Sequence, residues 1–509
     1  MMPLPQGGEW PPRDWKPILD VQAEWAAWYS GDPNRIAEVH SGLVYTPTRK
    51  GRFWAQDVRE ERRVMLHVPL ASDLAAVSAD MLFSEPPKFV IPEAASGNNT
   101  AAKKTQAALE RLAEQNELHN RLLEAAEQAA GVGGVYLRVV MDPELANYPI
   151  LSPVPGDSAL PEFRWGRLVA VTFWRTVYDD GKTVLRHLER HELREGRGVI
   201  LHGLYMGTID MLGRKIPLDE HDATRGLPEE TLLPEGVGLA VRYVPNMRPA
   251  RRFRHIPAAA QLGQADFAGA EGLLDALDEV YTSWIRDVRL AKARIIVPRD
   301  YLERGEDGNW RFDMDREIWA GLDMDPSAEG QAAPTPVQFE IRTQEHEAAA
   351  LHLIERIVDH AGYSPQTFGL RIEGRAESGT ALRIRERRTF VTQARKQRYW
   401  QAPLAEILHV MLVLAREVYG NREIDASLQP HVQFEDSIAP STLELAQTAE
   451  VLMRAKAAST ETLVRLVHPD WSDEQVQAEV QRIYAEQGLG MPDLSSITNG
   501  IEAGGAGLA

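Results

Sequence analysis

Three side chains that could bind a metal ion alternate along one stretch of the sequence, at His187, Glu189 and His191. If the stretch is a β-strand, alternate residues share one face, and all three could reach a single cation. The surrounding residues are rich in arginine and glutamate, so a solvated strand is the simpler interpretation. We therefore assign no metal site to these residues.

Two acidic pairs, Asp313/Asp315 and Asp323/Asp325, could hold Mg²⁺ for phosphoryl transfer. They lie in a loop-rich segment, where solvated carboxylates are the simpler interpretation. The chain contains no cysteine and no G-x-x-x-x-G-K-[ST], G-x-S-x-G or H-E-x-x-H motif. We predict that the protein is not an enzyme and requires no cofactor.

A basic stretch interrupts an otherwise acidic chain. The whole sequence carries 74 Asp+Glu against 56 Lys+Arg, a net charge of −18, which argues against an overall basic surface that binds phosphates. The local excess of positive charge indicates either a stripe facing phosphates or one side of an interface with the acidic surface of a neighbouring subunit. The stretch comprises Arg371, Arg375, Arg383, Arg385, Arg387, Arg388, Arg395, Lys396 and Arg398.

Hydrophobic residues make up 44% of the 509 residues, as in an ordinary folded protein. The longest apolar stretch, Leu404 to Val418, is interrupted by Glu406, His409 and Arg416, so it is too short and too polar to cross a bilayer. Without cysteine, stability must come from apolar cores or subunit contacts. We expect no membrane partner.

The first part of the chain combines helices with a β-rich region. Helices are predicted at Ile18 to Ser30, Pro69 to Phe83 and Ala101 to Ala130. Short β runs follow between about 134 and 245, with a hairpin turn at Asp179-Asp180-Gly181. Strands and helices do not alternate, so the sheet should be mainly antiparallel and a doubly wound fold is not expected.

The second part is dominated by amphipathic helices. Apolar residues recur every three to four positions over Phe267 to Arg294 and over Gln344 to Ala361, with a small β insert between the two helices. A long helix is predicted from Ser378 to about Tyr419, with a kink at Pro403. A short strand at 431–434 and further C-terminal helices complete an α+β, mainly helical fold.

This arrangement resembles the portal proteins of tailed bacteriophages, of the siphophage type. The residues that carry the resemblance occur in the family's order and span most of the chain. They are LAAVSADMLFSEPP at 74–87, VPNMRPARRFR at 244–254, the stretch from Asp266 to Pro298, ESGTALRIRERRTFVTQARKQRYW at 377–400, and Phe434-Glu435-Asp436-Ser437 with the helices that follow.

The resemblance implies a ring, typically dodecameric, at one capsid vertex, and a portal fold with wing, stem, clip and crown. Each implied region corresponds to a range of this sequence. The ranges are 1–262 for an N-terminal arm and wing of mixed α/β structure, 263–294 for the first stem helix, 295–341 for the clip, 342–364 for the second stem helix, 365–378 for the tunnel loop, 379–420 for the long tunnel helix, 421–440 for a strand returning to the wing, and 441–509 for crown helices and a flexible tail.

The implied function is a channel for packaging and ejecting double-stranded DNA, located in the virion and, during assembly, in the host cytoplasm. Implied partners are the terminase large subunit, head-completion or adaptor proteins, and major capsid and scaffolding proteins. Arg371 and Arg375 become candidates for DNA contact in the tunnel loop, and Trp310 and Trp319 for docking at the clip. Candidates for the subunit interface or channel wall are Arg383, Arg387, Arg388, Arg395, Arg398 and Trp284.

Two alternatives stay open from the residues alone. One is a metal-dependent nucleic-acid-processing enzyme that uses the acidic pairs and the arginine stretch. The other is a helical capsid adaptor that does not contact DNA. Metal-dependent cleavage would favour the first alternative, and a monomeric or dimeric protein would favour the second.

Overall fold

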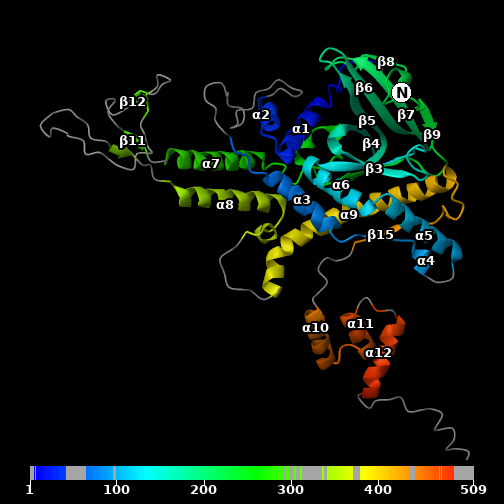
Figure 1. Ribbon diagram of the computed structural model, residues 1–509. Helices are drawn as coiled ribbons and strands as arrows, with labels where there is room; N and C mark the ends of the chain where they lie inside the picture. The colour runs from blue at the N-terminus through cyan, green and yellow to red at the C-terminus, as the bar shows by residue number, and fades with distance from the viewer. Residues whose placement is uncertain are drawn as a thin grey trace, which may run out of the picture. The chain divides into compact units, whose positions relative to one another are not determined.

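The computed structural model divides the chain into two compact units, residues 1–435 and 436–509. It describes residues 5, 7–41, 65–95, 99–291, 294–296, 303–304, 310–311, 335–337, 341–370, 379–434, 442–468, 471 and 473–486. The fold is α+β, with helices in both units (Figure 1).

The N-terminal helices pack around two buried tryptophans. They are α1 (Lys16–Ser30), α2 (Pro33–Ser41) and α3 (Leu70–Phe83), and the predicted helices at 18–30 and 69–83 are confirmed. Trp25 and Trp28 are almost fully buried in a cluster that also includes residues of two later helices, at 271–290 and 343–361. The Trp25 indole Nε1 donates to Glu271 Oε1 at 3.0 Å, so this N-terminal helix is fixed to the start of α7 (Glu271–Leu290).

The single helix predicted over Ala101 to Ala130 is wrong, because the structure has α5 (Thr100–Gln115) and α6 (Leu118–Val132) in its place. Glu117 between them adopts a left-handed conformation with φ of 49°. The buried Asn116 side chain donates to the carbonyl of Pro149 at 3.1 Å and accepts from the Leu151 amide at 2.8 Å. These bonds fix the break, since an asparagine can satisfy a neighbouring strand in place of the helix.

Two antiparallel sheets follow, as the sequence predicts. The first has the order β10-β2-β3, from strands Val241–Pro245, Gly134–Val140 and Ile150–Pro155. The second has the order β4-β5-β6-β7-β8, with β9 also paired to β7. Its strands are β4 (Ala159–Arg164), β5 (Arg167–Asp179), β6 (Val184–Arg194), β7 (Arg197–Gly207), β8 (Arg214–Ile216) and β9 (Glu230–Leu232).

The predicted turn at Asp179-Asp180-Gly181 joins β5 to β6. Asp180 Oδ1 accepts from the amides of Lys182 and Thr183 at 2.9 and 2.6 Å, and Gly181 has a φ of +81°. Glycine adopts this conformation without steric cost, which explains its position in the turn.

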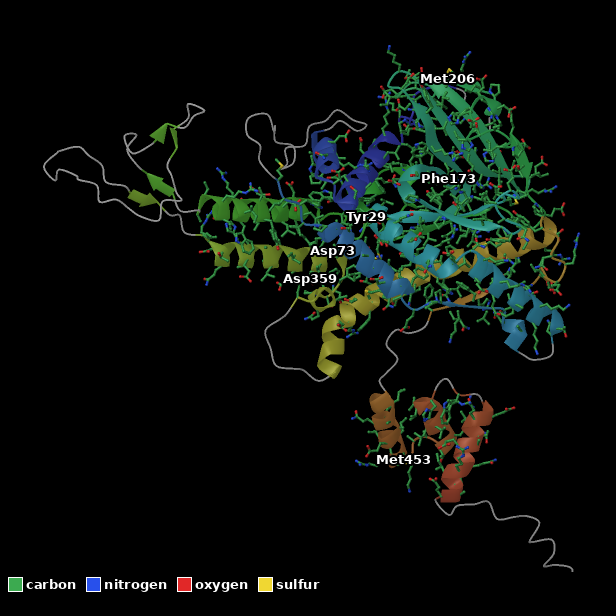
Figure 2. All side chains as sticks on the ribbon, in the orientation of Figure 1. Tyr29, Asp73, Phe173, Met206, Asp359 and Met453 are labelled. Carbon is green, nitrogen blue, oxygen red and sulfur yellow. The ribbon has the colours of Figure 1, made fainter. Side chains whose placement is uncertain are left out.

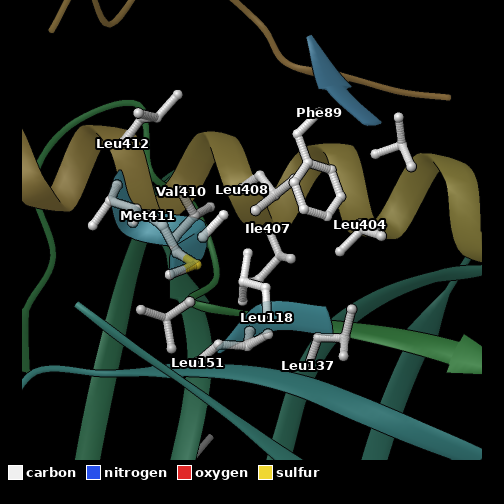
Figure 3. Packing of buried hydrophobic residues seen from close by; sticks show 14 of the residues in the cluster. Phe89, Leu118, Leu137, Leu151, Leu404, Ile407, Leu408, Val410, Met411 and Leu412 are labelled. Atoms are coloured by element: carbon white, nitrogen blue, oxygen red, sulfur yellow. The ribbon is translucent and has the colours of Figure 1, made fainter. Parts of the chain in front are cut away.

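The largest apolar core forms where α9 (Gly379–Glu417) crosses the three-stranded sheet and α5 and α6. Leu404, Ile407, Leu408 and Met411 point from this helix toward Leu118, Leu137 and Leu151 (Figure 3). Their spacing of three and four residues is that of one helix face. The helix assignment continues through Pro403 without interruption.

Two strands far apart in the sequence pair with each other in this unit. The strand β1 (Lys88–Val90), followed by the short helix α4 (Pro92–Ala95), pairs antiparallel with β15 (His431–Gln433). The predicted strand at 431–434 is thereby confirmed, and it returns to the N-terminal part of the chain.

The two predicted amphipathic helices are α7 and α8 (Thr343–Ala361), which lie side by side in Figure 1. Short antiparallel pairs lie between them in the sequence: β11 (Arg294–Ile296) with β14 (Thr335–Val337), and β12 (Glu303–Arg304) with β13 (Trp310–Arg311). The acidic pairs at 313/315 and 323/325 lie outside the described residues.

The C-terminal unit contains α10 (Thr442–Arg454), α11 (Thr460–Val467) and α12 (Asp473–Glu486). The C-terminal helices expected from the sequence are therefore confirmed. Ser459 caps that helix by accepting from the Thr462 amide at 3.3 Å. Val464, Val476 and Val480 form the unit's small core.

The solvated strand proposed for His187, Glu189 and His191 is wrong for the two histidines, which are 4% and 1% exposed on β6. His191 Nε2 lies 2.7 Å from Glu189 Oε1, and Arg138 donates to the other oxygen at 2.9 Å. Burial alone would raise the pKa of Glu189, but these two bonds hold it well below its usual range. In the described part of the chain, no group of three acidic or histidine side chains could hold a metal.

His187 occupies a position that disfavours protonation. Its Nδ1 accepts from Arg175 Nε at 3.2 Å, and its Nε2 lies 3.2 Å from His202 Nδ1. A proton added to Nδ1 would face the guanidinium of Arg175. Burial, His202 and Arg175 together lower the pKa of His187 to about 4.

We predict that the His187→Gln variant loses less unfolding free energy than the parent protein when the pH is lowered. The unfolded histidine takes up a proton below about pH 6.5, whereas the folded one stays neutral down to about 4, so stability is fully present above 6.5 and falls between these values. Removing this effect should recover up to about 3 kcal/mol of the loss over that window. Denaturant unfolding at pH 7.5 and at pH 5 measures the difference, with the exposed His255→Gln as control. An unchanged pH dependence in His187→Gln would contradict the assignment.

Candidate channel and assembly surfaces

Polar side-chain contacts join α7 and α8 at both ends of the pair. The positions of these contacts show that the two helices run antiparallel. Near the end of α7, Asp287 Oδ2 accepts from Arg342 Nη2 at 2.8 Å and lies 3.0 Å from His346 Nε2. The bond with His346 and the guanidinium of Arg342 lower the pKa of Asp287. At the opposite end, His360 Nε2 lies 3.0 Å from the carbonyl oxygen of Ala268.

Trp284, a predicted interface or channel residue, lies against its own helix pair. Its ring stacks on His346 with centroids 6.1 Å apart and an interplanar angle of 10°. Other apolar side chains on the pair remain exposed, at 36% for Ile285, 40% for Val288 and 44% for Leu351. The pair therefore combines internal packing with apolar side chains that are exposed in the part of the chain that the structure describes.

A buried ion pair lies at the meeting point of the long helix α9 with the rest of the unit. Lys396 Nζ lies 2.6 and 2.7 Å from the two carboxylate oxygens of Asp266, with 2% and 0% of the two side chains exposed. Burial lowers the pKa of Lys396, and the Asp266 carboxylate opposes that change. The short distances indicate an ammonium–carboxylate pair, which a buried charge requires.

Further polar groups complete the surroundings of this pair. Lys396 Nζ also donates to Ser78 Oγ at 2.5 Å. Tyr363 donates to Asp266 Oδ2 at 2.8 Å, and Asn246 Nδ2 donates to Asp266 Oδ1 at 2.7 Å. Burial, followed by the Asp266 charge, raises the pKa of Tyr363 well above its usual value. One cluster thus joins α3, the segment after β10, the residues following α8, and α9.

The arginines predicted for the interface or channel have different surroundings. Arg387 and Arg398 are exposed. Arg388 pairs with Asp359 at 3.1 Å, with both side chains about half exposed (Asp359 is labelled in Figure 2). Arg395 donates to the backbone carbonyl of Arg248. Their proposed roles between subunits or toward DNA stay predictions.

Several predicted site residues lie outside the residues that the structure describes. Arg371 and Arg375 are in the segment 371–378, and Trp319 lies between 312 and 334. Arg383 and Trp310 belong to α9 and β13, but nothing is described of their side chains.

Lys396 and Asp266 were not identified as a pair from the sequence. The sequence places Lys396 in the basic stretch. Its spacing from neighbouring buried residues also indicates that it lies on the buried face of the helix. Thr389, Thr392, Lys396 and Trp400 recur every three or four residues and are all buried, as one helix face would be. A lysine on such a face requires a buried carboxylate, which Asp266 provides from a distant part of the chain.

Residues 252–489, which contain α7 to α12, match the family described as "Phage portal protein, SPP1 Gp6-like". The resemblance inferred from the sequence is therefore confirmed. The matched residues make up less than half of the chain, and over them the chain is similar to a family of structural portal proteins.

Solved structures also match, with low similarity. The chain in "Virion of native gene transfer agent (GTA) particle" is 12% identical with a TM-score of 0.41, covering 91% of this chain and 96% of that chain. The chain in "Neck of native GTA particle computed with C12 symmetry" is 13% identical with a TM-score of 0.43, covering 91% and 95%. These values are too low to support an argument. No curated protein matches the chain.

We predict that Asp266→Asn destabilises the protein by about 3–5 kcal/mol, because it leaves the Lys396 ammonium buried without a carboxylate. Adding Lys396→Met should recover part of the loss, since it removes the unpaired charge. Arg388→Met, on the same helix, is the matched control and should cost about 1 kcal/mol or less, because its pair with Asp359 is solvated. Thermal and denaturant unfolding measure all three, and equal losses for Asp266→Asn and Arg388→Met would refute the prediction.

Proposed function

We propose that this chain forms a ring of about twelve copies at one capsid vertex, with a central channel through which double-stranded DNA is packaged and ejected. The observation that carries the proposal is the portal-family match over residues 252–489. It covers the antiparallel helices α7 and α8, the β insert between them and the long helix α9. The ring belongs to the virion and assembles in the host cytoplasm.

Within this proposal, the regions take the family's roles. Residues 1–262 and the returning strand at 421–440 form the wing, α7 and α8 within 263–294 and 342–364 form the stem, and 295–341 form the clip. Residues 365–378 form the tunnel loop, 379–420 the tunnel helix and 441–509 the crown. The clip, with Trp310 and Trp319, docks the terminase large subunit and later the head-completion proteins.

The helix pair supports assembly into a ring. Each stem contacts a neighbour on both sides, so its outer faces need side chains that another copy can cover. Ile285 and Val288 on α7 and Leu351 on α8 are exposed in the single chain, and burial of apolar side chains favours association. Major capsid and scaffolding proteins surround the ring during assembly.

The charge of the chain supports passage of DNA without tight binding. Each phosphate that a protein neutralises adds salt-dependent affinity, which would resist movement. A net charge of −18 per chain keeps the ring as a whole repulsive toward phosphate. Arg371 and Arg375 are the proposed exceptions, making brief contacts with phosphates in the tunnel loop.

Assembly is tested on the purified full chain. Negative-stain imaging should show rings with an axial hole, and native mass measurement should give a multiple of the 56.9 kDa chain. Ile285→Glu/Leu351→Glu should reduce ring formation severalfold, because it places charges on the stem faces. Leu145→Glu, at a residue 77% exposed outside the stem, is the control. A protein that stays monomeric or dimeric would overturn the proposal.

The tunnel-loop arginines are tested in packaging. Arg371→Ala/Arg375→Ala should form normal rings but package DNA severalfold more slowly, because the phosphate contacts are lost. Arg214→Ala, which removes an exposed arginine of β8, should package at the normal rate. A normal packaging rate and full-length genomes in the double variant would exclude the assigned role.

A further inference from the structure

A cavity of about 440 Å³ with five arginines in its wall lies beside the buried ion pair. Its wall comes from the segment 247–268 after β10, the C-terminal half of α8 and the first half of α9. The arginines approach from all three: Arg248 and Arg251 from the segment, Arg356 from α8, and Arg388 and Arg395 from α9.

Each of the two carboxylates in the cavity wall already forms an ion pair within the chain. Asp266 pairs with Lys396, and Asp359 pairs with Arg388. Within the described part of the chain, the guanidinium groups of Arg248, Arg251 and Arg356 form no ion pair with a carboxylate. Three cations thus line one cavity without a counterion among the described residues, in a protein of net charge −18.

We propose that this cavity binds a phosphate-class oxyanion. A guanidinium presents its N–H groups as a planar fork that fits two oxygens of a phosphate or carboxylate. A carboxylate carries one charge and two oxygens, whereas a phosphate group offers more oxygens and up to about two charges at neutral pH. The number of guanidiniums and the volume of the cavity therefore favour phosphate over a single carboxylate side chain.

Part of the cavity wall is apolar and buried. Ala265, Ala268 and Ala361 line it and are at most 8% exposed. Thr392 is committed to the fold, since its hydroxyl donates to the Gly362 carbonyl at 2.7 Å. In this proposal the arginines hold the ligand, and the alanines contribute shape without polar contacts.

This inference goes beyond the channel function and does not depend on it, because the cavity lies within one chain. The phosphate can come from a nucleic-acid backbone or from a free anion such as pyrophosphate.

The test is calorimetric titration of pyrophosphate into the purified full chain at low ionic strength. We expect one site per chain, and binding at least about tenfold weaker in Arg251→Gln/Arg356→Gln, because two charge-assisted contacts are lost. Both arginines are exposed, so the fold should be retained, and unfolding temperatures verify this. Arg254→Gln, an exposed arginine near Arg251 that does not line the cavity, should bind as the parent does.

A short DNA duplex added in competition identifies the source of the phosphate. Displacement of pyrophosphate by the duplex supports the proposal with DNA as the ligand, and lack of displacement supports it with a free anion. Equal binding by the parent and the double variant would overturn the proposal. So would absence of pyrophosphate binding to the parent combined with loss of rings in the double variant, which would indicate that the arginines bind carboxylates of a neighbouring chain.

Discussion

The arrangement of the larger unit depends on the buried ion pair between Lys396 and Asp266. A charged lysine at 2% exposure is unfavourable unless a carboxylate and further polar groups surround it. Ser78 accepts a further bond from the ammonium, whereas Tyr363 and Asn246 donate to the carboxylate of Asp266. The requirement to satisfy one ammonium thus fixes where α9 lies relative to α3 and the end of α8.

The long helix α9 changes character along its length for the same reason. Its first half buries polar residues, from Thr389 to Lys396, whereas its second half buries Leu404, Leu408 and Met411 against the sheet (Figure 3). An apolar face can slide by a methyl group at modest cost, but a hydrogen-bonded ion pair tolerates little displacement. The polar half therefore sets the register of the helix, and the apolar half packs into the largest core.

Local patterns in the sequence were sufficient for many elements and failed where a distant residue decides the outcome. The periodicity of 344–361 and the turn at 179–181 each depend on neighbouring residues, and the structure confirms both. The break at Asn116 depends on Pro149 and Leu151, and the burial of His187 depends on Arg175 and His202. Neither could be read from the helix or strand alone.

Contacts with distant residues also decide the surroundings of the arginine stretch. Its excess of positive charge was evident in the sequence, yet the structure places Arg388 beside Asp359 and Arg395 against the Arg248 carbonyl. These contacts direct both side chains toward the arginines of the segment 247–268, which the charge pattern had not connected with α9. Because positive charges that converge in one hollow repel one another, the fold gains most if an anion occupies the space between them. An acidic chain can therefore bind phosphate where its arginines converge, although its net charge repels phosphate overall.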